Sequence, residues 1–426
     1  MVYDWNEVMR SFVQDSPWLR GIVSTIAMSV AMVSIRLYWA KKNGDNEGEE
    51  KLRRSMLILP PSERTKFVHY HIAVGALEEV SLEHPMYKLL RGEFSVLTGF
   101  QMLYITQVYQ ELVGEAFWYL ERNRLKAPVR AYPIPPTTVV SVPSTPEGRY
   151  IIYANGKFYE VPFSDILHFR WPDPLRPLSR GSGIGTSLRQ EISADRSAGQ
   201  VIALRFSSQA IPPAVMKVDD VSDNDLEELK SYWMNEAHKL WISGIPMLMN
   251  RDFQVHEFGA SFQSLQLSDL RQLQRDMFIQ AFGIPPEIIG HQKNANRSTI
   301  NAAEYLYNKI RILPRIEANR QVLQNFLAPQ YDSALIVHAD NPVDEDRDFQ
   351  LRAFAAMPET VKVDEWRVRV QQLPPLGKEN GGDEFIQNSK STRIQRKRNR
   401  GTGNDQVGKE PYVGYPDSEA EGEDRE

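Results

Sequence analysis

The absence of cysteine is the feature that most constrains how this chain can fold. Without thiols there can be no disulfide, no cysteine-ligated zinc or iron–sulfur cluster and no cysteine nucleophile. The 426 residues must therefore form a stable structure through packing alone. A chain of this length has enough residues for two or three domains with a buried core.

Charge and composition exclude two further classes of protein. The 50 Lys and Arg residues against 55 Asp and Glu give a net charge of −5, which argues against a strongly basic protein that reads DNA sequence. Gly and Pro have the frequency found in ordinary globular proteins, which excludes a collagen-like or wholly disordered chain.

An uncharged run occupies residues 21–35, between Arg20 and Arg36. Its fifteen residues fall short of the roughly 20 that a helix needs to cross a bilayer. We expect a helix packed against the rest of the protein or against a partner. A helix on or across a membrane and a targeting signal are the alternatives.

Two segments are too polar to form a core. Residues 40–55 are charged and contain glycine, and we interpret them as a linker. In residues 377–426 only eight of fifty residues are hydrophobic, and a basic block at 393–400 is followed by an acidic block at 418–426. Such a segment buries too little apolar surface to offset its ordering entropy, so a disordered tail is predicted.

The first half of the chain changes from helical to strand-like patterns. Residues 94–125 predict a helix, and the Pro-punctuated stretch 128–170 predicts a small antiparallel sheet. Within this stretch Asn155-Gly156 joins two aromatic and β-branched runs, which is the strongest short signal for a hairpin. A glycine-containing loop then leads to a helix over 186–209, for which Ser187 is the expected cap.

A compact subdomain is predicted between this helix and the next. Strand-like residues 214–220 precede a helix that begins near Ser222, and further strands are predicted at 245–250 and 253–258. The following helix, 264–282, has an apolar face made of Leu270, Leu273, Met277 and Ala281.

Glycine and proline end that helix and interrupt the next one. Gly283 supplies a left-handed C-cap, and Pro285-Pro286 prevent continuation. The longest helix, 298–327, is expected to begin at Ser298 and to kink at Pro314. Its expected apolar stripe consists of Ile300, Ala303, Tyr307, Ile310, Leu313, Ile316, Leu323 and Leu327.

The glycines of residues 180–188 do not form a nucleotide-binding motif. Gly181 and Gly183 fit the start of G-x-G-x-x-G, but Thr186 occupies the third glycine position and no Lys-Ser/Thr follows. A turn before a helix explains them better.

No other arrangement of residues predicts catalysis or metal binding. His69 and His71 would share one face of a strand, but neither a carboxylate nor a third histidine follows at metal-ligand spacing. The acidic cluster that begins at Asp340 lacks the glycine of a calcium loop and suits a helix N-terminus; its other members are Asp344, Glu345, Asp346 and Asp348. We therefore predict no catalytic residue, no metal and no cofactor, and a protein that is not an enzyme.

The order of several motifs over about residues 160–330 resembles tailed-phage portal proteins of the HK97-like type. The strand DILHFRW (165–171) is followed by PDP…GSGIGTSL, by FGIPP (282–286) and then by a long helix that contains Leu313-Pro314. The most specific parts are Leu167, His168 and Arg170 of the strand, the FGIPP segment and Leu313-Pro314 of the long helix. Residues 1–60 and 377–426 lie outside the resemblance.

The resemblance implies an α+β portal fold: an α/β wing, a two-helix stem with an inserted small α/β clip, a long Pro-kinked wing helix, a short or poorly formed crown and a disordered C-terminal tail. The expected divisions are an N-terminal apolar helix and charged linker (1–60), wing (61–185 and 300–345), stem helices (186–211 and 261–287), clip (212–260), tunnel loop (288–299), crown-like segment (346–376) and tail (377–426).

The resemblance also implies a function and partners. It implies a ring, typically a dodecamer, at one capsid vertex, which is the conduit for double-stranded DNA during packaging and ejection and a head–tail connector. The implied partners are other copies of the chain, double-stranded DNA without sequence specificity, the terminase large subunit, adaptor or head-completion proteins and the major capsid protein. The implied location is the portal vertex of the virion, with the host cytoplasm during assembly.

Two sets of residues are candidates for contacts within this function. The tunnel loop contains no acidic residue and carries phosphate-contacting side chains, namely His291, Lys293, Asn294, Asn296 and Arg297. An ordinary solvent-exposed loop is the alternative for each of them. In the clip, Trp233 and Trp241 can share a helical face, and with Asn235 and His238 they are candidates for partner binding. Core packing is the alternative for the two tryptophans.

Net charge is consistent with a passive conduit, because each basic contact with phosphate adds salt-dependent affinity that resists sliding of DNA. The main rival hypothesis is a membrane-anchored interaction or scaffold protein that uses the N-terminal apolar helix. A hydrolase or nucleotidyl-transfer enzyme would need a metal or nucleotide site that these spacings do not provide.

Overall fold

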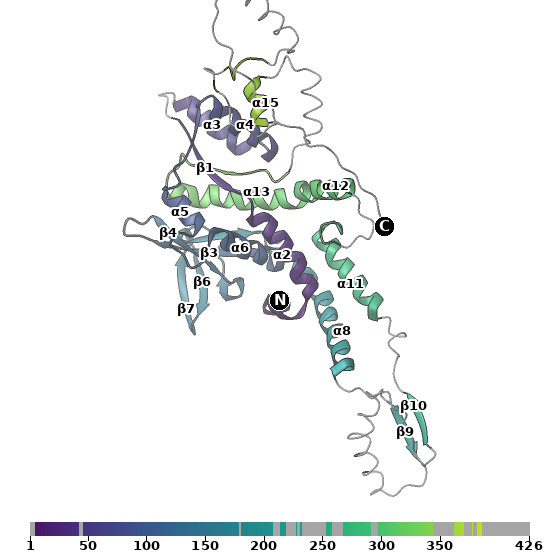
Figure 1. The fold of residues 1–426 in the computed structure, drawn as a ribbon. Helices are drawn as coiled ribbons and strands as arrows, with labels where there is room; N and C mark the ends of the chain where they lie inside the picture. The colour runs from purple at the N-terminus through teal and green to yellow at the C-terminus, as the bar shows by residue number, and fades with distance from the viewer. Residues whose placement is uncertain are drawn as a thin grey trace, which may run out of the picture. The chain divides into compact units, whose positions relative to one another are not determined.

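The computed structural model describes residues 5–41, 46–178, 180–207, 214–218, 227, 231, 253–257, 267–290, 297–343, 362–369, 377 and 381–385. The chain divides into two compact units, Met1–Val343 and Asp344–Glu426. Helices and strands are mixed along the first unit, so the predicted α+β class is confirmed (Figure 1).

The N-terminal apolar run forms a buried helix. After α1 (Trp5–Arg10) and the π-helical η1 (Ser11–Asp15), α2 spans Pro17–Ala31. The Ser16 hydroxyl accepts a hydrogen bond from the Leu19 N–H at 3.3 Å and so caps α2. Residues along α2 are buried against α6 (Gly99–Val113) and α11 (Leu267–Phe282), which confirms the expected packed helix. Among the described residues no helix is long and apolar enough to span a bilayer.

The segment after α2 also belongs to the first unit. β1 (Ile35–Ala40) is the central strand of an antiparallel sheet, between β2 (Leu77–Glu79) and β11 (Ile336–Ala339). Leu37 pairs with Val337, about 300 positions later in the chain, and Leu37 is fully buried. Residues 17–40 of the predicted N-terminal division 1–60 therefore supply a helix and a strand to the core of the first unit.

Two predictions for the N-terminal region are wrong. Asn46–Ile58 forms the helix α3 where the sequence predicts a linker over 40–55. Pro61–Ala73 forms the helix α4, so His69 and His71 do not alternate along a strand. Two residues apart on a helix, their side chains are about 200° apart and cannot share a face.

Two small sheets follow α5 (Pro85–Arg91) and α6. Gly114, with a φ of 89°, ends α6, and β3 (Glu115–Arg122) begins directly after it, so the helix predicted over 94–125 is wrong at both ends. The single sheet expected over 128–170 is in fact two antiparallel sheets. One has the order β4 (Pro128–Ile134), β3 and β8 (Ile166–Arg170); the other has the order β5 (Val139–Ser141), β6 (Arg149–Ala154) and β7 (Lys157–Pro162).

Short turns complete this part of the fold. Asn155 and Gly156 have φ values of 51° and 76° between β6 and β7, so the predicted hairpin is confirmed. The 3₁₀ turns η2 (Pro136–Thr138) and η3 (Phe163–Asp165) precede β5 and β8.

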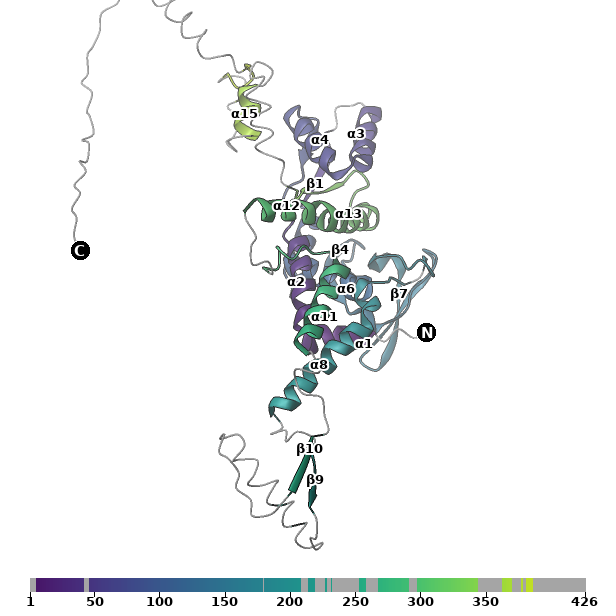
Figure 2. The same cartoon turned by 90° about the vertical axis from the view of Figure 1, so that its right-hand side faces the viewer.

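A pair of helices and a pair of strands come next. α7 (Ile184–Ser187) leads into α8 (Arg189–Ser207), and the Ser187 hydroxyl donates to the Ile184 carbonyl instead of capping α8 as predicted. α8 and α11 contact each other, as Figure 2 shows from the side. β9 (Ala214–Val218) and β10 (Phe253–Glu257) pair antiparallel, where strands are predicted at 214–220 and 253–258. Most of the helix predicted from Ser222 and all of the strand predicted at 245–250 lie outside the described residues.

The long C-terminal helix of the first unit contains two π turns. It runs through α12 (Arg297–Tyr307), η5 (Asn308–Ile312), α13 (Leu313–Val322), η6 (Leu323–Leu327) and the 3₁₀ turn η7 (Ala328–Gln330). It begins at Arg297, so Ser298 is not its cap. Pro314 follows the first π turn, and because proline lacks an N–H, the backbone irregularity falls where a kink is predicted.

The first π turn changes which side chains are buried. The next buried residue after Tyr307 is Ile312, five positions later, whereas Ile310 is 58% exposed. A regular helix would bury Ile310, and the inserted residue of the π turn moves it to the surface. Ile300 is also exposed. Ile300 and Ile310 are therefore the two members of the predicted apolar stripe that lie on the surface.

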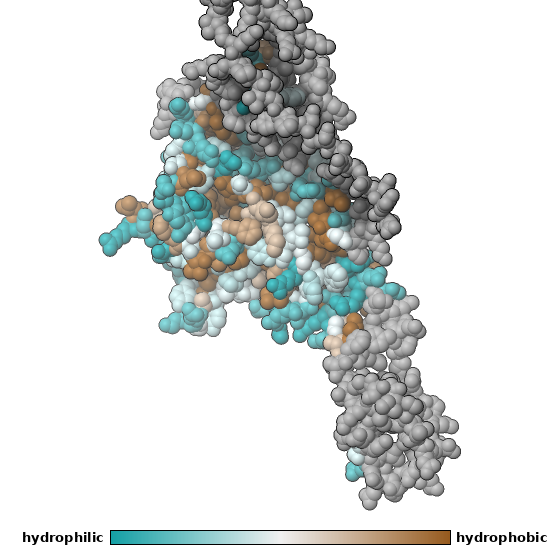
Figure 3. All heavy atoms as spheres, in the orientation of Figure 1, coloured by the Kyte–Doolittle hydropathy of each residue, from teal (hydrophilic) through white to brown (hydrophobic). Residues whose placement is uncertain are grey.

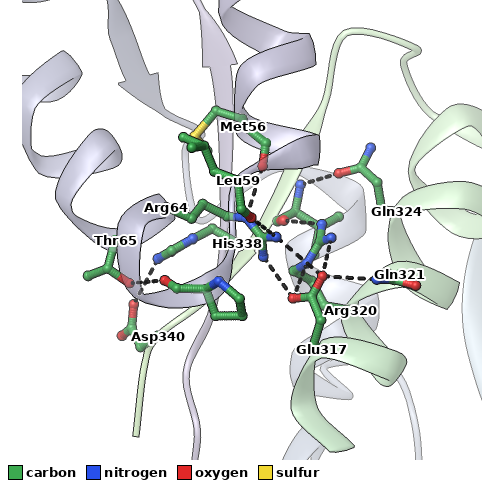
Figure 4. A network of polar contacts seen from close by, with 12 residues as sticks. Met56, Leu59, Arg64, Thr65, Glu317, Arg320, Gln321, Gln324, His338 and Asp340 are labelled. Atoms are coloured by element: carbon green, nitrogen blue, oxygen red, sulfur yellow. Dashed lines mark hydrogen bonds and ion pairs between the residues drawn. The ribbon is translucent and has the colours of Figure 1, made fainter. Parts of the chain in front are cut away.

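A buried cluster of charges joins α4 to α13 and β11 (Figure 4). Arg64 donates to both carboxylate oxygens of Glu317, at 2.7 and 3.2 Å, and to the carbonyls of Met56 and Leu59. Arg320 donates to Glu317 and to the Val337 carbonyl. Burial alone would raise the pKa of Glu317, but the hydrogen bonds from Arg320 and Arg64 outweigh it and lower that pKa to about 2.

The second unit contains α15 (Val363–Arg369). Lys362 pairs with Phe385 in an antiparallel bridge, and the Asp364 carboxylate accepts a hydrogen bond from the Gly377 N–H at 3.0 Å. Residues 377 and 381–385 therefore pack with α15, and the prediction that a disordered tail begins at 377 is wrong for them. Residues 386–426 lie outside the described residues.

We predict that Arg64→Ala lowers the free energy of unfolding by about 3–5 kcal/mol, because it leaves the buried Glu317 carboxylate with one of its two cationic partners removed. Urea unfolding of the purified chain measures this. Arg54→Ala is the matched control, because Arg54 and Glu50 form an exposed ion pair that should contribute less than about 1 kcal/mol. Equal losses in the two variants would contradict the role of the buried cluster.

Stability should fall in acid because of His338 in β11. Burial, together with Arg64, Arg320 and His69, lowers the pKa of His338 to about 4, although Asp340 opposes the shift. The folded chain therefore holds this imidazole neutral while the unfolded chain protonates it below its ordinary pKa of 6.5. The contribution of neutral His338 to the free energy of unfolding is complete above pH 6.5 and is lost as the pH falls towards 4. Denaturant unfolding across this range should show a shallower decline for His338→Gln; an unchanged decline would contradict the assignment.

Candidate functional site

Most of the residues predicted to make functional contacts lie outside the described part of the chain. This is true of His291, Lys293, Asn294 and Asn296 in the loop before α12, and of the clip residues Trp233, Asn235, His238 and Trp241. Arg297 is the first residue of α12. The structure describes the elements on either side of the two segments: β9 and β10 for the predicted clip, and α11 and α12 for the loop.

The N-terminal support of the loop is the C-terminus of α11. Gly283 has a φ of 64°, and its N–H donates to the Gln280 carbonyl while the Ile284 N–H donates to the Ile279 carbonyl, which confirms the predicted left-handed C-cap. Ile284, Ile288 and Ile289 then pack against the same core as α2.

The FGIPP segment meets the long helix at Gly283. A Cβ atom added to Gly283 would overlap the guanidinium of Arg311, which lies in the π turn just before Leu313-Pro314. The FGIPP segment is therefore in contact with the π turn directly before Leu313-Pro314. This contact joins the C-terminus of α11 to the long helix that follows residues 291–296.

The paired helices are joined to α2 by a buried carboxylate. Asp195 of α8 is 2% exposed; it accepts a hydrogen bond from the Ser16 hydroxyl at 2.8 Å and lies 3.6 Å from the Arg271 guanidinium of α11. Asp195 thus links the cap of α2 to α8 and, through Arg271, to α11.

The exposed face of α8 carries no formal charge among its described side chains, namely Gln190, Ser193, Ala194, Ser197, Gln200 and Ala203. Arg189 and Arg196 lie beside this face and pair with Glu7 and Asp15. Such a surface offers DNA few phosphate contacts.

The predicted apolar face of α11 lies on the surface of the single chain. Leu273 is 58% exposed, and Leu270 and Met277 are also exposed, whereas Phe278 and Phe282 are fully buried. The larger aromatic side chains occupy the core, so the leucine stripe is left on the surface.

The strand motif around His168 serves the fold. Glu115 at the start of β3 is fully buried, and its carboxylate accepts hydrogen bonds from Arg180 at 2.7 Å and the Gly181 N–H at 2.8 Å; its contact with His168 Nε2 is 3.2 Å. Burial lowers the pKa of His168, whose ring stacks on Phe117. These residues join β3 and β8 to the loop before α7.

The glycines of that loop allow close backbone contact. A Cβ atom at Gly183 would overlap the backbone of Gly114 and approach the carbonyls of Gln110 and Glu111 at 2.9 Å. This confirms that the segment is a packed turn before a helix. Close packing explains its glycines better than a nucleotide-binding role does.

Sequence reasoning missed the buried acids that organise these contacts. Glu115 precedes the apolar run AFWYL, and Glu111, which Arg315 contacts through two hydrogen bonds at 2.6 and 2.8 Å, lies in the last turn of α6. A carboxylate inside an otherwise apolar pattern is the signal that could have identified them. Among the described residues no group of His, Asp and Glu is arranged to hold a metal ion.

Comparison with known proteins decides the family. A family model described as phage portal protein matches residues 68–370. The chain belongs to the phage portal protein family. This is a family of structural, non-enzymatic proteins of the virion, located at the portal vertex of the capsid. No curated protein matches the sequence.

Solved structures share the fold. The chain resembles a protein from the neck of an empty gene transfer agent (GTA) particle, with a TM-score of 0.59 and 17% identity, over 87% of this chain and 94% of that one. A neck of a native GTA particle computed with C12 symmetry gives a TM-score of 0.57 and 17% identity, over 88% and 94%. An HK97 family phage portal protein from Corynebacterium diphtheriae is a weaker match. Its TM-score is 0.49 and its sequence identity 15%, over 83% of this chain and 99% of that one.

We predict that Gly283→Ala destabilises the portal protein more than Gly290→Ala. Both glycines have a positive φ, which costs an alanine about 1–2 kcal/mol, but a Cβ atom meets Arg311 only at Gly283. Thermal unfolding of both variants measures the difference in melting temperature. Adding Arg311→Ala to Gly283→Ala should remove part of that difference, because the guanidinium that the new Cβ atom overlaps is then absent. Equal melting temperatures for the two glycine variants would contradict the contact.

Proposed function

We propose that this portal protein assembles into a dodecameric ring at one capsid vertex and is the conduit through which double-stranded DNA is packaged and ejected. The observation that carries the proposal is the family match over residues 68–370. One similar GTA neck was computed with C12 symmetry and another with C6 symmetry, and a ring of twelve subunits is compatible with both.

The parts of the fold take the roles expected for this family. We assign the wing to 61–185 and 300–345, together with α2 and β1, which share its core. The stem consists of α8 and α11 within 186–211 and 261–287. The remaining divisions are the clip (212–260), the tunnel loop (288–299) and the crown-like segment (346–376).

In this proposal the stem and the tunnel loop treat DNA differently. The uncharged exposed face of α8 binds phosphate weakly and allows sliding, because few counterions are released. The tunnel loop supplies the phosphate-contacting residues, namely His291, Lys293, Asn294, Asn296 and Arg297. The clip, through Trp233, Asn235, His238 and Trp241, binds the terminase large subunit and later the adaptor proteins, while the outer surface of the wing contacts the major capsid protein.

Ring formation is tested by native mass spectrometry and negative-stain imaging of the purified full chain. The proposal expects a twelve-subunit mass and images with a central channel. A chain that remains a monomer or dimer at all concentrations would contradict it.

The tunnel loop is tested with the double variant Lys293→Ala/Arg297→Ala. We expect rings of normal mass but less DNA retained per assembled particle, with the deficit largest at low salt and smaller at higher salt, because the two phosphate contacts per subunit that are lost are themselves weakened by salt. Arg91→Ala/Arg124→Ala removes the same charge from exposed positions elsewhere and is the control. Failure of ring assembly in the loop variant would show that the loop is assigned wrongly.

A further inference from the structure

One face of the first unit has an exposed apolar patch on α2 and α6. Met28 of α2 and Met32, the residue that follows its last turn, are 49% and 76% exposed, although much of the helix is buried. On α6, Phe100 is 45% exposed and its ring stacks on Tyr104. We call Met28, Met32 and Phe100 the methionine patch.

The members of this patch are neighbours because α2 and α6 pack antiparallel. The Ser24 and Tyr104 hydroxyls are 3.1 Å apart, which fixes the register of the two helices. The start of α2 lies against α8 through Ser16, and the end of α6 lies against the loop and helix that precede α8. One turn after Ser24 is Met28, and one turn before Tyr104 is Phe100. Figure 3 shows apolar residues exposed on this face.

A second exposed apolar surface lies on the hairpin of β6 and β7. Tyr153 and Phe158 are opposite each other in the hairpin, with ring centroids 5.0 Å apart, and Phe158 is 68% exposed. β7 is an edge strand of its sheet. We call Tyr153 and Phe158 the aromatic hairpin.

The two surfaces are on opposite sides of the first unit. α2 faces the viewer in Figure 1 while the hairpin recedes, and in Figure 2 α2 and β7 lie towards opposite edges of this unit. One chain cannot bring them together. A second copy can, and two different patches on opposite sides of a subunit are what a head-to-tail contact that closes into a ring requires.

The chemistry of the two surfaces is complementary. Methionine side chains are flexible and polarisable, and they pack favourably against aromatic rings. The run 21–35, which contains Met28 and Met32, is uncharged, so no ion within this run has to lose its hydration when an aromatic hairpin covers it. Exposed contiguous apolar surface is typical of protein–protein contacts.

We propose that the aromatic hairpin of one copy packs onto the methionine patch of the next copy around the ring. The inference rests on the ring of the proposed function. It gives the N-terminal helix a second role, because the face of α2 that is not buried in its own subunit forms part of the contact between subunits.

Cysteine cross-linking tests this contact directly, because the chain has no cysteine that could react in the background. The variant Met32→Cys/Phe158→Cys is treated with a short bis-maleimide and separated in denaturing gels. We expect a ladder of covalent oligomers that extends to the full ring. The single variants Met32→Cys and Phe158→Cys should give no ladder, because each places only one thiol at each contact.

Met32→Cys/Leu125→Cys is the control, because Leu125 is more exposed than Phe158, at 87% against 68%, but lies in the turn between β3 and β4. Native mass and negative-stain imaging of the cysteine-free chain are recorded in parallel. Rings without a ladder in the Met32→Cys/Phe158→Cys variant, or an equal ladder from the control pair, would overturn this contact and leave the ring intact. Dimers from Met32→Cys alone would overturn it in favour of a symmetric contact. A cysteine-free chain that forms no ring would overturn the proposed function as well.

Discussion

The burial of α2 is the interaction on which the rest of the first unit depends. Its run of uncharged residues is too short for a bilayer and packs instead against α6 and α11, with Leu19, Val23 and Ile26 fully buried at about 1.5–3 kcal/mol each. The Ser16 cap of α2 reaches Asp195 in α8, and the strand after it pairs with β11. Residues before the matched region 68–370 thus hold together the elements within it.

The motifs that carry the resemblance to portal proteins act through buried contacts. His168 of the strand motif and Arg180 of the glycine loop both reach the carboxylate of Glu115, and Gly283 of FGIPP lies against Arg311 of the long helix. These contacts join the helices and strands on either side of the segments that we propose as clip and tunnel loop. The DNA conduit that we propose needs such buried contacts, because its channel must keep its shape while its contents move.

Local signals in the sequence predicted local structure. The hairpin at Asn155-Gly156 and the left-handed cap at Gly283 depend on one or two residues, and both are confirmed. The predictions that failed depend on distant partners: helix α3 replaces a linker, and β1 finds its place only beside β11. The π turn at 308–312 reassigns Ile310 to the surface, which no helical periodicity anticipates. For the candidate site, the loop and clip residues stay predictions, because all of them except Arg297 lie outside the described residues. The structure adds the buried acids Glu111 and Glu115, which the sequence pattern alone did not single out.

The most direct test of this account is the thermal unfolding of residues 41–426 compared with the full chain, followed by circular dichroism. If α2 and β1 complete the core, the shortened chain should lack a cooperative transition and should aggregate or remain partly unfolded, with or without detergent. A shortened chain that is monomeric and unfolds cooperatively at the melting temperature of the full chain would show that the core does not depend on α2.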